Sequence, residues 1–495
     1  MGLFSFFKKP GVGLPPLKLH NTLSNTLEEF TPLKSPAVKM YNCGPTPYDH
    51  QHIGNMVPPT LADLLRRTLE VWGYKVTQVM NITDFGHLTG DNEGDPDQGD
   101  DKMTKGLTRE GLKPTMVNMR KLAEKYARLF FEDVELLGVD TKRVAYPRAS
   151  DYIPEQIALI KTLVQKGYGY EIADGVYYDT TRFKGYGKLG NIHLEGQRAG
   201  VRVLEKAGKK NPHDFVLWKK SERMGWPSPW GKGFPGWHIE CTAMIFKLLG
   251  KQIDIHTGGI EHIPIHHNNE IAQAEAATAK PYVKYWLHNA HITVEGKKIA
   301  KSLGNTVYVH NLVDRGLNPK ALRYWFLTGH YRTPMNFTWE AIEGADQALK
   351  RLTRAYLEMA EINSSAPRTG HLAEGEVRRS KQNEFMEAFY TAIGNDLGTA
   401  QALALVWDNI KTLDQATLKK VDRVLGLGFS EEKEAAKLKV LKASDIPEHV
   451  QNLLDEREVA RKQKDFAHAD QLRNDIETAG YTLKDTSEGP KITHN

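Results

Sequence analysis

The sequence predicts an α/β protein with a parallel sheet that is interrupted by an insertion and followed by an all-α C-terminal bundle. Three observations predict this fold. A strand, a turn, a helix and a second strand follow one another between residues 38 and 83, which is the βαβ unit of a parallel sheet. Short β-like segments and glycine-rich turns break that pattern at 145–225. Beyond about residue 340, hydrophobic residues recur at helical spacing almost throughout.

The first βαβ unit rests on clear local signals. Residues 38–41 (VKMY) are typical of a buried strand, which Gly44 and Pro45 end. Residues 60–72 carry leucines at helical spacing, and residues 75–83 predict the second strand. A right-handed crossover then places the two strands side by side in one sheet.

The α/β pattern returns after the insertion, and the chain then becomes helical. Residues 237–249 predict a helix, and 252–259 predict a strand and its turn. Near the C-terminus, 447–480 predicts a helical hairpin, in which Asp465 caps the second helix and Gly480 ends it.

Composition describes an ordinary globular chain of mild charge. Its hydrophobic content of 40% and charged content of 26% are those of a soluble protein, and the net charge of +5 permits an anionic partner without requiring one. Two cysteines cannot build a disulfide framework, although their number permits one bridge. We therefore expect a reducing, cytoplasmic setting. No run of eighteen apolar residues predicts a membrane helix.

The two cysteines lie beside glycine-rich turns that also carry histidines. Cys43 follows the first strand in YNCGPTPYDHQHIGN, and Cys241 lies in GWHIECTAM. His266 and Glu270, in HHNNE, are four residues apart, so on a helix they share one face. Two thiolates, an imidazole and a carboxylate are a zinc donor set, but inert buried cysteines and a surface His–Glu pair explain the same spacing. The spacing also leaves two competing ligands open, His238 and His267.

Two further stretches have features of a phosphate site. HIGN follows a strand and a turn and leads into a helix, whose free N–H groups suit phosphate. Gly54 allows close approach of a nucleotide, and His52 is a donor for phosphate oxygens. GKKIAKSLGN places Lys298 and Lys301 in a glycine-flanked loop that can neutralise a triphosphate. A helix start without a ligand and a solvated basic loop are the alternatives.

Taken together, these stretches resemble one family, the cysteinyl-tRNA synthetases of class I. HIGN resembles the HIGH motif of that class with Asn55 in the final position, and KIAKS resembles its KMSKS motif. More specific stretches follow in the family's order from about residue 20 to 485: CGPTPYDHQHIGN, NITDFGH, WPSPWGKGFPGWHIEC, HHNNEIAQAEA and SLGN.

The resemblance implies a Rossmann-like catalytic domain split by a connective insertion. The implied order is a flexible lead-in (1–19), the first catalytic half (20–144), the insertion (145–225), the second catalytic half (226–290), a stem-contact region with the KMSKS-like loop (291–345), a helical bundle (346–430) and an anticodon-binding tail (431–495). The stretch TSEGPKITHN lacks the tryptophan that is common near the family's C-terminus.

The resemblance also implies roles for individual residues. The zinc ligands are Cys43, Cys241, His266 and Glu270. The substrate cysteine is met by Gly44, Thr83, Trp237 and Glu261, where Glu261 replaces the family's usual Asp. ATP is met by Thr46, His52, Asn55, His256, Gly258 and Lys301. The catalytic groups are His52, Asn55, Lys298 and Lys301.

The implied reaction joins L-cysteine to tRNA(Cys) through cysteinyl-adenylate, with Mg²⁺ accompanying ATP. One Zn²⁺ per chain selects cysteine through its thiolate, so we expect no editing domain. The resemblance suggests a monomer. The nearest alternative is a ligase of mycothiol-type synthesis that joins cysteine to an amino sugar, and a zinc-containing RNA-binding protein without catalysis is a third reading. The long helical tail favours the tRNA reading over the amino sugar, and the intact KIAKS loop argues against a non-catalytic protein.

Overall fold

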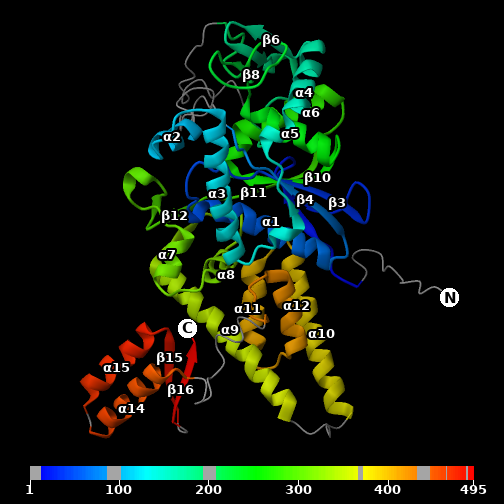
Figure 1. Ribbon diagram of the computed structural model, residues 1–495. Coiled ribbons are helices and arrows are strands. Elements are labelled where there is room, and N and C mark those ends of the chain that lie inside the picture. Colours follow the sequence, from blue (N-terminus) through cyan, green and yellow to red (C-terminus); the bar gives the residue numbers. More distant parts are fainter. Residues whose placement is uncertain are drawn as a thin grey trace, which may run out of the picture.

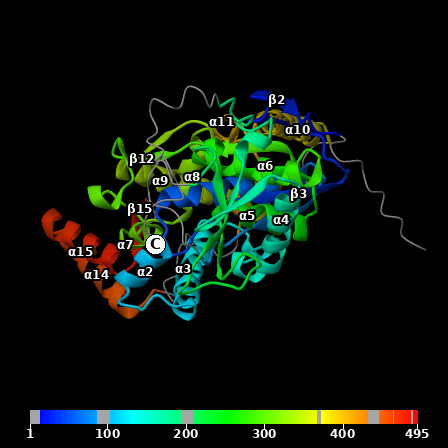
Figure 2. The ribbon, with the colours of Figure 1, turned by 90° about the horizontal axis from the view of Figure 1, so that it is seen from above.

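The computed structural model describes residues 13–85, 102–192, 208–365, 372–431, 446–463, 465–486 and 489–494. In Figure 1 the small sheet of the insertion lies at one end, the parallel sheet lies in the middle, and helices α9 to α12 form the other end. The C-terminal unit stands to one side, and Figure 2 shows the same separation from above. The N-terminal lead-in up to residue 12 falls outside the described residues.

The central sheet has five parallel strands in the order β11-β10-β3-β4-β5. This confirms the predicted parallel sheet and its βαβ unit. The strands are β3 (Ala37–Asn42), β4 (Lys75–Met80), β5 (Val144–Ala145), β10 (Ile253–Gly259) and β11 (Val283–Asn289).

Both faces of the sheet are covered by apolar helices, as parallel sheets require. Met40 and Leu287 on one face pack in the same core as Leu65 of α1 (Val57–Val71). On the other face, Tyr41 and Trp286 share a core with α5 (Trp237–Leu248) and α6 (Asn268–Thr278). A β1–β2 hairpin (Lys18–Asn21, Thr26–Glu29) lies beside β11. Two more helices, α2 (Lys102–Arg109) and α3 (Met116–Leu136), lie between β4 and β5 in the chain.

The insertion is an antiparallel sheet in the order β6-β7-β8-β9, preceded by a helix. Aromatic and branched residues make β7 and most of β8 buried. Its elements are α4 (Ile153–Gln165), β6 (Gly169–Ile172), β7 (Gly175–Tyr178), β8 (Phe215–Lys220) and β9 (Gly233–Pro235).

The region after β11 begins with a small sheet and continues as helices. The sheet has the order β13-β12-β14: β12 (Ile292–Val294), β13 (Lys297–Lys298) and β14 (Met335–Phe337). The helices are α7 (Val309–Asp314), α8 (Lys320–Thr328), α9 (Trp339–Ser365), α10 (Leu372–Gly394), α11 (Thr399–Asn409) and α12 (Gln415–Leu425).

A buried ion cluster joins this helical region to the sheet domain. Arg323 of α8 is fully buried and donates to Asp63 of α1 at 2.7 Å and to the carbonyl of Leu425 in α12 at 2.8 Å. Arg66 and Arg67 of α1 also pair with Asp63. A carboxylate held by three guanidinium groups fixes the angle at which the three helices meet.

The C-terminal unit contains the predicted helical hairpin, α14 (Glu448–Lys462) and α15 (Phe466–Thr478). Asp465 caps α15 through the backbone N–H of His468, as predicted. The chain then forms a β-hairpin, β15 (Tyr481–Thr486) and β16 (Gly489–His494), so the tail is not helical to its end. The alternating apolar residues of these strands pack on the two helices, and this short period-2 pattern was not recognised in the sequence.

Within the described ranges, none of the helices combines the length and the hydrophobicity that crossing a lipid bilayer requires.

Candidate metal centre and nucleotide site

The strand order reverses between β3 and β10, and the candidate site lies at their carboxyl ends. From β3 the chain moves outward to β4, whereas from β10 it moves outward to β11 on the opposite side. Cys43 follows β3 directly, and its N–H donates to the carbonyl of Thr257 in β10 at 3.0 Å. In open α/β sheets, ligands bind at such a reversal point.

Four buried metal-binding side chains converge at this point from four separate elements. Cys43 follows β3, Cys241 lies in α5, His266 lies in a π-helical turn (Ile263–His267), and Glu270 lies in α6. One ligand atom from each lies within 4.8 Å of all the others. The structure therefore brings together the four residues that the sequence nominated.

Two polar atoms of this group lack a hydrogen bond among the residues that the structure describes. They are His266 Nε2 and Glu270 Oε1, which are fully buried and lie 3.0 Å apart. A buried polar atom without a partner is costly unless a ligand satisfies it. The group thus fits a metal ion in its donor types and in two buried atoms that face each other without a well-directed hydrogen bond.

A second group, Cys43, His256, His267 and Glu270, also has metal-binding atoms within 4.8 Å of one another. Its atoms are already occupied, however. His256 Nε2 lies 3.1 Å from Glu270 Oε2, and His267 Nε2 lies 3.2 Å from Cys43 Sγ. Tyr282 also donates to Glu270 Oε2 at 3.1 Å. These residues therefore surround the first group and orient its ligands.

His238 orients the histidine ligand. Its Nδ1 lies 2.9 Å from His266 Nδ1. When Nε2 of His266 presents a lone pair to a metal, its Nδ1 must carry the proton and donate to His238. Of the two competing ligands left open by the spacing, His238 thus contacts His266, and His267 contacts Cys43.

The protonation of the four ligands reflects their close packing. Burial raises the pKa of Cys43 well above its ordinary value, whereas a hydrogen bond from Cys43 lowers the pKa of Cys241 to about 6. Burial lowers the pKa of His266, but Cys241 and Glu270 outweigh it and raise that pKa to about 10. Burial raises the pKa of Glu270, yet His256 and His266 bring it well below its ordinary value. These shifts favour a thiolate at Cys241 and a carboxylate at Glu270.

The residues expected around the substrate cysteine border this group. The Trp237 ring stacks on His266 with centroids 4.2 Å apart. The Gly44 N–H donates to Asn81 Oδ1 at 2.9 Å, and a Cβ on Gly44 would lie 1.7 Å from the Asn81 carbonyl oxygen, so only glycine fits. Thr83 donates its hydroxyl to Glu240 Oε2 at 2.9 Å.

Glu261 lies at the rim of this region. Its carboxylate is half exposed and 3.7 Å from His291 Nδ1. A Cβ on Gly259 would lie 2.1 Å from Glu261 Oε2, so the side chain folds back over β10. The longer carboxylate at this position therefore reaches the strand ends that border the metal group.

The HIGN stretch forms a 3₁₀ turn (Ile53–Met56, preceded by His52) that leads into α1. His52 Nδ1 accepts from the Gly54 N–H at 3.1 Å, and Asn55 Oδ1 accepts from the His52 N–H at 3.2 Å. Burial lowers the pKa of His52, so its ring is neutral, and its one proton lies on Nε2 because Nδ1 accepts. A neutral donor therefore stands at the N-terminal end of the helix.

The two lysines of the KIAKS loop differ in their surroundings. Lys298 lies exposed in β13, whereas Lys301 forms an ion pair with Asp49, which also pairs with Arg109 of α2 at 2.6 Å. Partial burial lowers the pKa of Lys301, while the contact with Asp49 favours its charged form; because the ion contact is direct, the ammonium stays charged. Thr46, half-buried in the same segment as Asp49, accepts from the Tyr48 N–H through its carbonyl at 3.1 Å.

Two expected nucleotide contacts lie deeper than the others. His256 is fully buried, with its ring directed at Glu270. Gly258 packs against histidine rings, since a Cβ there would lie 2.7 Å from both His262 Nδ1 and His267 Cε1. The side chain of His256 therefore belongs to the metal group.

Sequence reasoning missed Asp49 and the hydrogen-bond partners of the ligands. Asp49 lies in PYDH, next to residues that were singled out, but its partners Arg109 and Lys301 are distant in the chain. His267 was noted only as a competing ligand. The run of histidines near Glu270 was the available signal, but their order around a metal depends on tertiary contacts.

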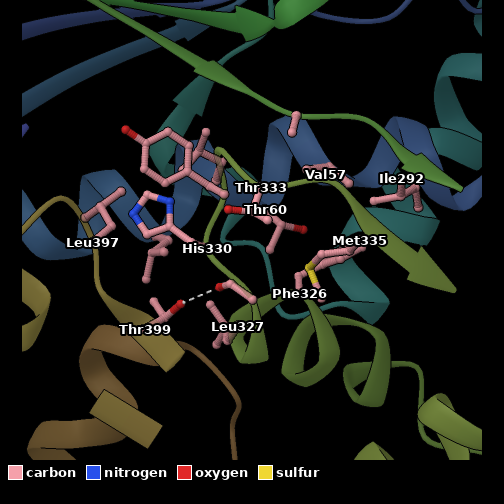
Figure 3. A pocket seen from close by; sticks show the side chains of 15 residues that line it. Val57, Thr60, Ile292, Phe326, Leu327, His330, Thr333, Met335, Leu397 and Thr399 are labelled. Carbon is pink, nitrogen blue, oxygen red and sulfur yellow. Dashed lines mark hydrogen bonds between the residues drawn. The ribbon is translucent and has the colours of Figure 1, made fainter. Parts of the chain in front are cut away.

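A separate apolar pocket lies between α1, α8 and the start of α11. Figure 3 shows its lining side chains, and its space of about 490 Å³ is partly open to solvent. The Thr399 hydroxyl on its wall donates to the Gly329 carbonyl at 3.3 Å, as the dashed line marks. None of its lining residues belongs to the predicted site.

Comparison with known proteins defines the class first. Residues 29–347 match the family described as the tRNA synthetases class I (C) catalytic domain. A methionyl-tRNA synthetase structure from Mycobacterium tuberculosis, bound by methionyl-adenylate, shares the fold at a TM-score of 0.55 and 14% identity, covering 80% of this chain and 89% of that chain. Residues 443–490 match the cysteinyl-tRNA ligase anticodon binding domain.

Whole-length relatives then define the family. The chain is 42% identical over 488 residues to a cysteine–tRNA ligase 1 of Burkholderia lata, covering 96% of this chain and 97% of that protein. It is 39% identical over 491 residues to a cysteine–tRNA ligase of Treponema denticola, covering 95% of this chain and 98% of that protein. The chain therefore belongs to the cysteine–tRNA ligase family of class I aminoacyl-tRNA synthetases.

Proposed function

We propose that this chain joins L-cysteine to tRNA(Cys) in two steps. The carboxylate of cysteine attacks the α-phosphorus of ATP, the bond to the bridging oxygen breaks, and cysteinyl-adenylate and pyrophosphate form. The terminal ribose hydroxyl of the tRNA then takes the cysteinyl group, and AMP leaves. Membership of the ligase family, over nearly the whole chain, supports this reaction.

The observation that carries the proposal is the buried group of two thiols, one imidazole and one carboxylate, in which His266 Nε2 and Glu270 Oε1 face each other without a well-directed hydrogen bond. We assign Zn²⁺ to it, held by these two residues with Cys43 and Cys241. When bound, zinc supplies a coordination position that a thiolate sulfur fills well and a serine hydroxyl fills poorly. The chain's part is to hold the four donors and to place the rest of the amino acid beside them.

Bordering residues orient the substrate cysteine. Trp237, stacked on His266, lies beside the metal ligands. Gly44 is fixed against Asn81 by its N–H bond to the Asn81 side chain, and Thr83 is fixed by its bond to Glu240. We assign the ammonium group of the substrate to Glu261 at the rim.

The ATP phosphates are assigned to the helix start and the KIAKS loop. His52 donates from Nε2 and Asn55 lies at the same helix end, with Thr46 and the Gly258 backbone on either side. Lys301 stabilises the charge of the leaving pyrophosphate, Lys298 assists, and Mg²⁺ accompanies ATP. The side chain of His256 is assigned to Glu270 instead of adenosine because it is buried there.

The tail is assigned to tRNA. Phe466 at the start of α15 is 62% exposed, which suits stacking against an unpaired base. Phe466→Ala should raise the KM for tRNA(Cys) about tenfold and leave cysteine-dependent ATP–pyrophosphate exchange unchanged. Val459→Ala on α14, also exposed, is the matched control. A loss of exchange in Phe466→Ala would count against a tRNA role.

The direct test of the reaction is charging of tRNA(Cys) with cysteine and ATP, compared with an amino-sugar acceptor. We expect charged tRNA and no amino-sugar product. Exchange without tRNA charging, but with amino-sugar ligation, would replace the proposal by the alternative ligase. Light scattering tests the expected monomer, and the expected cytoplasmic location is tested by fractionation.

A further inference from the structure

Three residues link Cys43 to the N-terminal hairpin through a line of hydrogen-bonding contacts. His267 Nε2 lies 3.2 Å from Cys43 Sγ, and His267 Nδ1 lies 2.7 Å from His288 Nε2. His288 Nδ1 lies 2.8 Å from the hydroxyl oxygen of Thr22, which follows β1. His267 and His288 are buried and Thr22 is half-buried, so the line runs from the metal group to the edge of the sheet domain.

The position of Thr22 does not depend on its hydroxyl. The Thr22 backbone N–H donates to the Trp286 carbonyl at 2.9 Å. Asn21 also donates to the Lys284 carbonyl and accepts from the Trp286 N–H, both at 3.0 Å. The Thr22 backbone and the Asn21 side chain therefore hold the hairpin on β11, and the Thr22 hydroxyl is available to contact His288.

Donors and acceptors can alternate along this line in either of two directions, and a thiolate at Cys43 permits only one of them. An unpaired imidazolium is expensive to bury, and the rings of His267 and His288 are both buried, so each ring carries one proton. A metal-bound Cys43 is a thiolate and accepts only, so His267 must donate from Nε2. Its Nδ1 then accepts from His288 Nε2–H, and His288 Nδ1 accepts from the Thr22 hydroxyl. In the reverse direction Cys43 would have to donate a thiol S–H to His267, and a metal-bound cysteine has no such proton.

We propose that Thr22, His288 and His267 are positioning residues that hold Cys43 as a thiolate ligand by pointing every proton of this line toward its sulfur. The proposal rests on the proposed function, which supplies the metal. An N–H donated to the sulfur offsets part of its charge and fixes its direction, and each bond strengthens the next along the line.

The proton order is tested at His288 with two amides of opposite geometry. His288→Gln places an amide N–H where Nε2–H lies, whereas His288→Asn places it where Nδ1 lies. Zinc affinity is measured by competition with a chromophoric chelator. The Gln variant should stay close to wild type and the Asn variant should bind zinc about tenfold more weakly, as loss of an outer partner does. Equal affinity in the two variants, at any level, would overturn the proposal.

A second pair of variants removes little volume and guards against misfolding at the buried histidine. Thr22→Val should weaken zinc binding about two- to tenfold, the value of one hydrogen bond, and Thr22→Ser should restore it. With Co²⁺ in place of zinc, the thiolate-to-metal charge-transfer band should shift in Thr22→Val and not in Thr22→Ser. Thr26→Val, exposed on the same hairpin, is the matched control. An unshifted band with unchanged affinity in Thr22→Val would overturn the proposal.

These measurements distinguish a failure of the proposed hydrogen-bond line from a failure of the proposed metal centre. A wild-type chain that takes up no zinc would overturn both the proposed metal centre and the line. Zinc bound with equal affinity by wild type and Thr22→Val would overturn the line alone.

Discussion

The two halves of the candidate site are built differently. The metal group is fully buried, and three of its four residues, Cys43, His266 and Glu270, each contact a further buried histidine. The half that we assign to the ATP phosphates is open, and its Lys301 is half exposed and held by an ion pair with Asp49. Selection of an amino acid needs donors that do not move. Binding and release of a triphosphate need contacts that exchange, and an exposed ion pair exchanges at little energetic expense.

The largest effect is expected at the buried half. Cys241→Ser should remove zinc and the preference for cysteine over serine together, because the ligand with the lowest thiol pKa is lost. The loss of zinc affinity should exceed the about 100-fold seen for outer partners of metal ligands. Metal analysis after dialysis, with exchange assays on both amino acids, measures this. Met244→Leu on the same helix is the volume-conserving control. Retained zinc in Cys241→Ser would remove Cys241 from the ligand set.

Substitution in the exposed half should slow the reaction without loss of the metal. Lys301→Ala should slow cysteine-dependent ATP–pyrophosphate exchange by about 10²- to 10³-fold, the value of one group that stabilises transition-state charge. Zinc content and cysteine binding should stay unchanged. Lys297→Ala, exposed in the adjacent β13, tests whether general loop charge explains the effect. An equal decrease of the exchange rate in the two variants would show that Lys301 contributes no more than the general charge of the loop.

A substitution at the junction of α1, α8 and α12 should lower the stability of the fold and leave the chemistry of the site unchanged. Burial alone would raise the pKa of Asp63, but Arg323, Arg67 and Arg66 outweigh it and lower that pKa to about 2. Because the folded pKa lies below the ordinary aspartate value of 3.8, this carboxylate stabilises the fold above about pH 4 and loses that contribution as pH falls toward 2.

Asp63→Asn should therefore lower the free energy of unfolding by about 3–5 kcal/mol at neutral pH, because Arg323 keeps a buried charge without its partner. Urea unfolding measures this, and the acid sensitivity between pH 4 and 2 should decrease in the variant. Zinc content of the folded protein should be unchanged. A stability equal to that of wild type would show that the cluster is not needed for the junction.

The smallest effect is expected at Asp49. Asp49→Asn removes the carboxylate that pairs with Lys301. The ATP phosphates then no longer compete with Asp49 for the Lys301 ammonium, so the KM for ATP should fall about two- to fivefold. Glu110→Gln, which removes the partner of Lys125 beyond α2, is the matched control. A raised KM for ATP would mean that Asp49 supports the bound state instead of the resting one.

The sequence alone predicted the parallel sheet, the insertion, the helical region and the helical hairpin of the tail. These features depend on local hydrophobic periodicity and on Gly, Pro and Asp at element ends, which act within a few residues. The terminal β-hairpin was missed because its six-residue strands gain their burial only against α14 and α15.

The four metal ligands were nominated through family motifs, since their spacing alone also suited His238 and His267. Only the tertiary structure distinguishes these histidines: His266 Nε2 faces Glu270 Oε1 without a well-directed hydrogen bond, whereas His267 and His256 make hydrogen-bonding contacts with Cys43 and Glu270. The partners Thr22 and His288 lie 266 positions apart, so no sequence window joins them. Likewise, Asp49 acquires its role only when the KIAKS loop folds back onto it.

Zinc removal and restoration tests the central claim most directly. Cysteine-dependent and serine-dependent ATP–pyrophosphate exchange should be measured on the native chain, on the chain stripped by a chelator, and after zinc is returned. We expect exchange with cysteine and not serine in the native chain, loss of exchange after stripping, and recovery with about one zinc per chain. A stripped chain, shown by metal analysis to hold no zinc, that still activates cysteine and rejects serine would contradict selection by a metal-bound thiolate.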